Sequence, residues 1–208
     1  LDTSELVVTD ATLVTLAEVP TPGADALAVS QGWLTYRVKL KEGGDGIFAR
    51  SIATPGAYGS LQSLATIGAP AQLSPPSLDG GVLLYGIART RGSRVVQRVL
   101  GTRKRRTLIR SGSALLFNPA VKGRSFAYVR TAGRGSRLMV RKRSKRGRGK
   151  SVFGVRRSRG TLTSTALTEG RAYVTLLHPS ATDPGAEVVE VALKRKKKQK
   201  RKKGKKKR

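Results

Sequence analysis

The sequence predicts an all-β fold built from about four blade-like repeats, as in a β-propeller. Three observations support this: short apolar segments rich in Val, Leu, Ile and Tyr, frequent Gly, Pro, Ser and Asp between them, and a weak internal repeat of 43 or 44 residues. No apolar pattern with a helical period is sustained for long enough to form a helix. A β-sandwich is the alternative, because strand spacing alone does not exclude it.

The repeat is clearest between segments 72–96 and 116–140. Both contain an apolar residue, a polar residue and Pro (Leu73-Ser74-Pro75 and Phe117-Asn118-Pro119), then a Gly-led apolar segment with an aromatic residue, then Gly-Ser-Arg before a further strand. Tyr85 and Tyr128 hold equivalent places, 43 residues apart. Fainter copies flank these two. A spacing of roughly 40 to 50 residues that holds about four strands is the size of one propeller blade.

The repeat divides the chain into a short start, four units and a basic tail. The expected boundaries are 1–24 for the start, 25–71, 72–114, 115–160 and 161–193 for the units, and 194–208 for the tail. Two interpretations of residues 1–24 stay open: strands that close the ring beside the last unit, or the remnant of a preceding blade. The tail is expected to be disordered, because its like charges repel one another.

Positive charge is the most pronounced feature of the composition. The chain has 42 Lys and Arg residues against 12 Asp and Glu, a formal net charge of +30. Its distribution is uneven: residues 80–168 contain 24 basic residues and no acidic one, and 13 more basic residues lie in the tail. Such an excess goes beyond what solubility requires and favours a polyanionic partner.

The residues that catalysis or metal binding would need are scarce. The chain has no Cys and a single His, His178, so the usual zinc sites and acyl-transfer triads cannot be assembled. Gly149-Lys150-Ser151 lacks the upstream glycine of a phosphate-binding loop, since Ser144 stands there. We therefore expect no enzymatic activity, no catalytic residues, no cofactor and no metal site. No run of about 20 apolar residues predicts a transmembrane helix.

The basic segments recur with the repeat. An offset of 43 aligns 103–106 with 146–149, inside the basic run 141–150, and an offset of about 47 reaches the start of the tail. All three segments are then expected to leave equivalent turns, between the third and fourth strands of their units, and to form one cationic face. The predicted polyanion-binding residues are Arg103, Lys104, Arg105, Arg106, Arg141, Lys142, Arg143, Lys145, Arg146, Arg148, Lys150, Arg156, Arg157, Lys194, Arg195, Lys196, Lys197 and Lys198.

Leu73-Ser74-Pro75, followed by Asp79-Gly80, an apolar strand ending in Tyr85 and then Gly92-Ser93, resembles the repeat of TolB-type β-propellers. The likeness covers the second unit well, and the third with Asn118-Pro119 in place of Ser-Pro. The resemblance implies a propeller fold and an extracytoplasmic or secreted location. Propellers of this type usually have more than four blades, so a divergent small ring, an open ring and a fragment are the alternatives.

These observations predict a non-enzymatic scaffold whose cationic face and tail hold it to an anionic polymer or surface. The expected partner is a polyanion, bound without sequence specificity: a cell-surface polymer, an anionic membrane or a nucleic acid. A protein partner on the propeller face is a further expectation. The alternative is a cytoplasmic accessory protein that binds nucleic acid with the same face. Few aromatic residues lie among the charges, which argues against reading of a base sequence.

Overall fold

The computed structural model describes residues 5–9, 15–20, 23–52, 57–144, 149–179 and 185–193, with side chains from residue 23 onward. The predicted all-β class is confirmed: the one helical element among these residues is the short 3-10 helix η1 (Arg157–Arg159). The first blade contains β3 (Ala24–Ser30), β4 (Trp33–Lys39), β5 (Asp45–Ser51) and β6 (Gln62–Ile67). The second contains β7 (Gln72–Leu73), β8 (Ser77–Asp79), β9 (Val82–Arg89), β10 (Gly92–Val99) and β11 (Arg105–Ser111).

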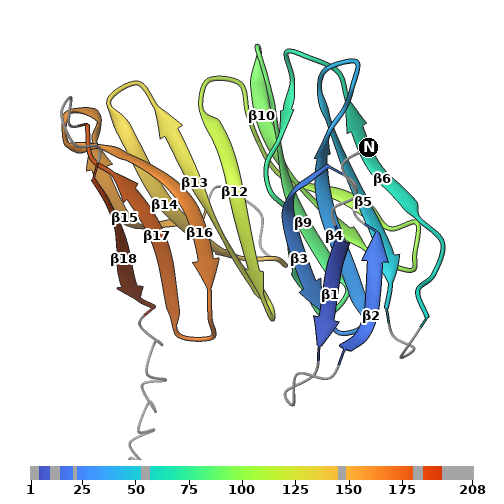
Figure 1. The fold of residues 1–208 in the computed structure, drawn as a ribbon. Coiled ribbons are helices and arrows are strands. Elements are labelled where there is room, and N and C mark those ends of the chain that lie inside the picture. Colours follow the sequence, from blue (N-terminus) through green and yellow to red (C-terminus); the bar gives the residue numbers. More distant parts are fainter. Residues whose placement is uncertain are drawn as a thin grey trace, which may run out of the picture.

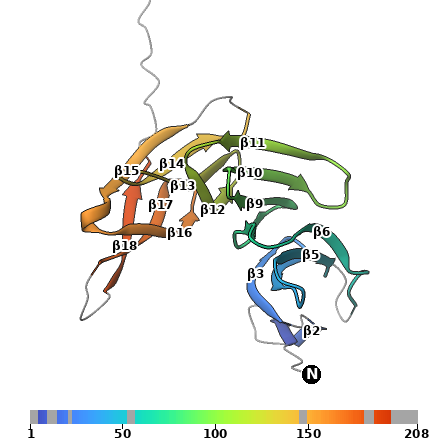
Figure 2. The same cartoon turned by 90° about the horizontal axis from the view of Figure 1, so that it is seen from above.

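The third blade contains β12 (Leu115–Lys122), β13 (Ser125–Ala132), β14 (Gly135–Lys142) and β15 (Lys150–Arg156). The fourth contains β16 (Thr161–Leu167), β17 (Arg171–Leu177) and β18 (Ala186–Ala192). Within each blade the strands are antiparallel and follow one another in chain order (Figure 1); in the second blade β7 and β8 both pair with β9 and together count as its first strand. Seen from above, the blades follow one another along an arc, with β3–β6 at one end and β16–β18 at the other (Figure 2). This four-bladed propeller arrangement excludes the sandwich alternative.

The N-terminal strands form a small sheet of their own. β1 (Glu5–Thr9) pairs with β2 (Thr15–Pro20), and among the described residues neither pairs with a strand of the four blades. The fourth blade has the order β16-β17-β18, so no N-terminal strand completes it among the described residues. That β1 and β2 are the remnant of a preceding blade stays a prediction.

Aromatic residues of the second strand of each blade fill the interior, as the repeat predicts. Tyr36 of β4, Tyr85 of β9 and Tyr128 of β13 are buried, and Tyr173 of β17 is half-buried. Phe126 is also buried and stacks on Tyr128, with 5.8 Å between ring centroids. Each buried aromatic ring removes a large apolar area from water, which makes these strands the centres of the cores.

Three of the four apolar clusters lie between blades, and the fourth, around Leu34 and Tyr36, lies on the first blade alone. Side chains of β5 and β6 pack against those of β9 and β10, and a second cluster joins β9–β11 to β12–β14. A third joins β12–β14 to β16 and β17. Neighbouring residues of a strand point to opposite faces, so Leu83 and Tyr85 face the first blade while Leu84 faces the third. Each middle blade is therefore sandwiched between two neighbours.

Polar contacts repeat at the joints between blades. Arg98 of β10 donates a hydrogen bond from Nη1 to the Leu64 carbonyl of the first blade (2.8 Å). Arg141, 43 residues later on β14, donates from Nη1 to the Leu108 carbonyl of the second blade (3.1 Å). Buried Asp45 accepts a hydrogen bond from the Leu73 backbone N–H (2.6 Å) and thereby joins the first blade to the second. These bonds satisfy backbone groups that the apolar interfaces would otherwise leave unpaired.

Asp79 makes the corresponding contact between the second and third blades. Its carboxylate accepts hydrogen bonds from the Gly123 N–H (2.7 Å) and from Lys122 Nζ (3.1 Å). Partial burial acts to raise the pKa of Asp79, but these two hydrogen bonds and the positive charges of Lys122 and Arg143 outweigh it. The pKa of Asp79 is consequently lowered from its ordinary value of 3.8.

We predict that Asp79 contributes a pH-dependent part of the stability. Because its folded-state pKa is lowered, the contribution is fully present above the ordinary pKa of 3.8 and is lost as pH falls through the lower folded-state value. Urea unfolding at pH 6 and at about pH 3 measures the difference. Asp79→Asn should lower the free energy of unfolding at pH 6 and reduce its fall on acidification. Glu169→Gln, at an exposed turn position, is the control; an unchanged acid response in Asp79→Asn would contradict the assignment.

Candidate functional surfaces: a cationic rim and a central pocket

A repeated hydrogen bond defines one rim of the propeller. In each blade the residue just after the third strand donates its backbone N–H to a carbonyl in the turn between the first and second strands, at 2.8 Å in all four cases. The donor and acceptor pairs are Ile52 and Gly32, Leu100 and Gly81, Arg143 and Arg124, and Leu193 and Gly170. The turns that follow the third strands are therefore structurally equivalent and lie beside the first hairpin turns. Leu193, after which the tail begins, holds the same place in the fourth blade.

The basic segments of the second and third blades lie at these equivalent turns. Arg103 and Lys104 are exposed in the β10–β11 turn, and Lys142, at the end of β14, is also exposed. Lys150 begins β15 on the same side. We call the basic residues in and beside these turns the cationic rim. Arg143 is half-buried and the other six are exposed. The rim consists of Arg103, Lys104, Arg105, Arg106, Lys142, Arg143 and Lys150. The predicted residues Lys145, Arg146, Arg148, Lys194, Arg195, Lys196, Lys197 and Lys198 lie outside the described residues.

The two basic turns meet at Arg106 and Arg143. Arg106 Nη2 donates hydrogen bonds to Gln97 Oε1 and to the Arg143 carbonyl, both at 3.1 Å. The Nε of Arg143 is buried and has no hydrogen-bond partner among the described residues. Burial lowers the pKa of Arg143, the charge of Arg106 lowers it further, and Asp79 acts in the opposite direction. Cationic groups of neighbouring blades are thus crowded together with little compensating negative charge.

Arg105 and Arg106 point to opposite faces of the second blade. Arg105 is paired with Arg98 across the strands and Arg106 with Gln97, so the pleat directs Arg105 toward the first blade and Arg106 toward the third. Arg105 and Arg106 therefore do not face the same neighbouring blade. It supplies cations to two separate joints.

Arg141 does not belong to the exposed surface, contrary to the sequence prediction. Arg141 is 8% exposed. Its guanidinium lies 5.4 Å from the centre of the Phe126 ring and donates a hydrogen bond to the Leu108 carbonyl. Burial lowers the pKa of Arg141, Tyr128 acts to raise it, and Arg106 lowers it. Arg141 is a joint residue between the second and third blades. Because successive side chains of a strand point to opposite faces, Arg141 faces the interior while its neighbour Lys142 is exposed.

Arg156 and Arg157 lie on the opposite rim from the basic turns. β15 begins at Lys150 in the cationic rim and runs across the blade to Arg156, where η1 follows. The Arg157 N–H donates to the Arg134 carbonyl in the β13–β14 turn (3.0 Å), which fixes this location. Both arginines are exposed, but the structure separates them from the other predicted site residues.

Sequence reasoning missed two cations that lie beside the cationic rim, Lys122 and Arg124. They flank the β12–β13 turn, beside the β14–β15 turn, as the Arg143–Arg124 hydrogen bond shows. Arg124 is exposed, and Lys122 forms an ion pair with Asp79 at 3.1 Å. Their isolation in the sequence gives no cluster signal; only the antiparallel pairing brings the two turns together.

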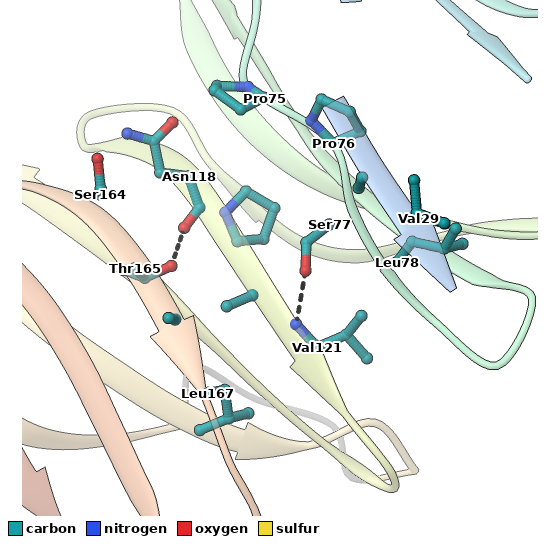
Figure 3. Close-up of a pocket in the computed structure, with 14 residues that line it drawn as sticks. Val29, Pro75, Pro76, Ser77, Leu78, Asn118, Val121, Ser164, Thr165 and Leu167 are labelled. Atoms are coloured by element: carbon teal, nitrogen blue, oxygen red, sulfur yellow. Dashed lines mark hydrogen bonds between the residues drawn. The ribbon is translucent and has the colours of Figure 1, made fainter. Parts of the chain in front are cut away.

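A pocket of about 330 Å³ lies where the first strands of all four blades converge. It is lined by Ala28 and Val29 of β3 and by residues 75–78, 118–121 and 164–167 (Figure 3). None of the described side chains that line it is charged. The lining is apolar with a few hydroxyl and amide groups, so its chemistry differs from that of the rim.

Proline residues shape this pocket by interrupting the first strands. Ser74, Pro75 and Pro76 separate β7 from β8, and the pairing of β12 with β13 shifts register around Asn118 and Pro119. Because Pro lacks an N–H, it cannot contribute a donor to the ladder. The Ser-Pro and Asn-Pro positions of the repeat thus mark the pocket wall. Asn118 also contacts the fourth blade. Its side-chain Nδ2 donates a hydrogen bond to the Thr163 carbonyl (3.1 Å), and its backbone carbonyl accepts one from the Thr165 hydroxyl.

His178 is exposed and lies 3.5 Å from a carboxylate oxygen of Glu187. Among the described residues, no three His, Asp or Glu side chains gather in an arrangement that could hold a metal ion. The same part of the chain contains no helix with the length and apolarity of a membrane span.

No protein-family model and no curated protein sequence matches the chain. Solved structures do match. The chain resembles one from a study of catalysis and specificity in two prolyl endopeptidases, with a TM-score of 0.61, 18% identity, and coverage of 92% of this chain and 30% of that one. TolB from Acinetobacter baumannii matches with a TM-score of 0.51 and 10% identity, over 84% of this chain and 44% of TolB. A chain of a nidogen/laminin complex matches with a TM-score of 0.53 and 11% identity, over 88% and 73%.

These matches confirm the propeller and the likeness to TolB at the level of the fold. The chain spans less than half the length of the prolyl endopeptidase and TolB chains. The same fold is found in an enzyme and in a complex between proteins, so function has to be argued from the surfaces.

We predict that Arg141 and its neighbour Lys142 differ sharply in their effect on stability. Arg141→Gln removes a buried guanidinium and leaves the Leu108 carbonyl without its donor, which should lower the free energy of unfolding by about 1–3 kcal/mol. Lys142→Gln, at an exposed position, should change it by less than about 0.5 kcal/mol. Urea unfolding of both variants checks this; equal effects would place Arg141 on the surface after all.

Proposed function

We propose that the chain is a non-catalytic propeller scaffold that binds anionic polymers or surfaces through the cationic rim. The observation that carries the proposal is the meeting of two basic turns from neighbouring blades at Arg106 and Arg143, where burial and repulsion from Arg106 lower the pKa of Arg143. A phosphate, sulfate or carboxylate group placed between such cations relieves this repulsion. The exposed residues around the joint extend the positive field over both turns.

The binding mechanism is electrostatic and without sequence specificity. Exposed Arg and Lys side chains neutralise charges of the polymer and release its counterions, so affinity falls steeply with salt. Leu193 holds the equivalent place in the fourth blade, so the basic tail follows the chain from the same rim. Tail and turns then act on one polymer.

The scaffold part of the proposal rests on the fold and on the residues available for chemistry. A single exposed His and the lack of Cys argue against the common hydrolytic and zinc mechanisms. The uncharged central pocket suits an apolar or hydroxyl-bearing segment of a protein partner better than a polyanion. The extracytoplasmic location implied by the TolB-type resemblance stays a prediction.

Removal of rim charges should reduce binding to labelled single-stranded RNA, duplex DNA and anionic vesicles. We choose Arg103→Gln, Lys104→Gln and Lys142→Gln together, because all three residues are exposed. On single-stranded RNA the slope of log Kobs against log salt should become shallower by about 0.7 for each phosphate that the variant no longer neutralises, or roughly 2 in total. Fluorescence anisotropy across a salt series measures it for the nucleic acids, and vesicle sedimentation for the membranes.

A matched triple variant removes the same charge from the opposite rim: Arg91→Gln, Arg134→Gln and Arg159→Gln, all at exposed positions. It should leave the slope nearly unchanged. Equal losses in the two triple variants would show that net charge alone matters and would overturn the rim as a site. If RNA and DNA bind but vesicles do not, the nucleic-acid alternative is favoured.

A further inference from the structure

Arginines stand directly opposite one another on the face of the second blade that is turned toward the first blade. Arg94 of β10 is paired with Arg110 of β11, and Arg98 with Arg105. Val96, which lies between Arg94 and Arg98 on the same face, packs into the core with the first blade. Like charges at directly opposed positions of a sheet are destabilising. Two such pairs along one face form an unusual concentration of positive charge.

The protein supplies little compensation for this charge. In the described part of the chain, the ion pairs involve other residues, and none of the four arginines has a carboxylate partner. Arg98 donates to the Leu64 carbonyl, a neutral acceptor. Burial lowers the pKa of Arg94, and the charges of Arg105, Arg89 and Arg110 lower it further. The positive charges of these side chains therefore repel one another in the folded state.

A buried donor lies within the same group. Tyr85 is 0% exposed, and among the described residues its hydroxyl has no hydrogen-bond acceptor, while the Arg105 guanidinium lies beside it as a donor. Burial raises the pKa of Tyr85, opposed by the charges of Arg105, Arg98 and Arg94 and by a hydrogen bond from Arg105, so the phenol stays protonated at neutral pH. A buried hydroxyl without an acceptor is costly, and here every neighbouring charge is a donor as well. The missing element is an acceptor that carries negative charge.

We propose that Arg94, Arg98, Arg105 and Arg110, here called the arginine cluster, bind a phosphate or sulfate group, to which the Tyr85 hydroxyl donates a hydrogen bond. Guanidinium groups offer paired donors that match the oxygens of such a group. Arg105 and Arg110 are exposed, so the cluster is open to solvent on the side of β11. The hydroxyl is covered in the structure, and an oxyanion reaches it when the exposed Arg105 side chain moves aside.

The site goes beyond the proposed function, because it recognises a single anionic group between the first and second blades. It shares only Arg105 with the cationic rim. Arg94, Arg110 and Tyr85 belong to the cluster alone, and their variants test it independently of polymer binding.

The test is titration of the full chain with inorganic phosphate, at an ionic strength held constant with sodium chloride, followed by calorimetry and by the shift in thermal unfolding. Saturable binding is expected. Arg94→Gln, and independently Arg110→Gln, should weaken it about tenfold or more, since each removes a charged hydrogen-bonding group. Arg134→Gln, which removes an exposed arginine elsewhere, should weaken it less than about twofold. Non-saturable binding, or equal weakening by Arg134→Gln, would overturn the site.

Tyr85→Phe tests the hydroxyl. It should weaken phosphate binding about tenfold, yet leave thermal unfolding without phosphate unchanged or improved, because the hydroxyl has no acceptor to lose and the exposed Arg105 can turn to solvent. Tyr128→Phe, at the equivalent place in the core between the second and third blades, is the matched control and should leave phosphate affinity unchanged. Equal affinities of wild type and Tyr85→Phe would remove the hydroxyl from the site.

Further arms separate the source of the group and the two proposals. Inorganic sulfate replaces phosphate, and vesicles of phosphatidylcholine with phosphatidic acid present the phosphate on a lipid; Arg94→Gln should weaken every form that the cluster binds. The triple rim variant retains Arg105 and should keep its phosphate affinity while the salt dependence of its RNA binding becomes shallower. Loss of phosphate binding alone in Arg94→Gln, with RNA binding kept, supports the cluster whatever becomes of the rim.

Discussion

The apolar faces that neighbouring blades turn toward one another are buried only by packing together, and the rest of the structure depends on this packing. Leu83 and Tyr85 complete a core with the first blade, whereas Leu84 and Val95 complete one with the third. A sheet buried on both faces cannot place charge in its middle, so cations collect at the turns, on the outer strands and near the ends of β10. The positions of the rim and of the arginine cluster both follow from it.

The same joints decide which arginines remain available for a partner. Arg98 and Arg141, 43 residues apart, each donate to a carbonyl on the outermost strand of the preceding blade. They hold neighbouring sheets together where the apolar contact ends, and their charges add to the field without full exposure. Arg103, Lys104 and Lys142 make no such contact and extend into solvent. Charge in this protein therefore serves both cohesion between blades and the binding that we propose, at neighbouring positions of the same basic runs.

Much of this architecture could be predicted because it depends on local patterns. The spacing of Tyr85 and Tyr128 marks the buried second strands, and the basic turns follow from the same offset. The face to which a given arginine points could not be predicted, because it depends on strand register and on bulges. In β10, for example, the pairing with β11 shifts between Val95 and Val96. A one-residue difference sends Arg105 and Arg106 to opposite joints and buries Arg141. The arginine cluster was missed because Arg94 and Arg110 lie far apart in the sequence and meet only through pairing.

The central claim is that anionic polymers bind at the rim formed by the β10–β11 and β14–β15 turns. Amide hydrogen exchange of the full chain, with and without single-stranded RNA at low salt, tests it most directly. The account predicts slower exchange at 100–106 and 122–124 and around Lys142, with little change in the β9–β10 and β13–β14 turns on the opposite rim. Protection spread evenly over both rims, or confined to the opposite one, would contradict it.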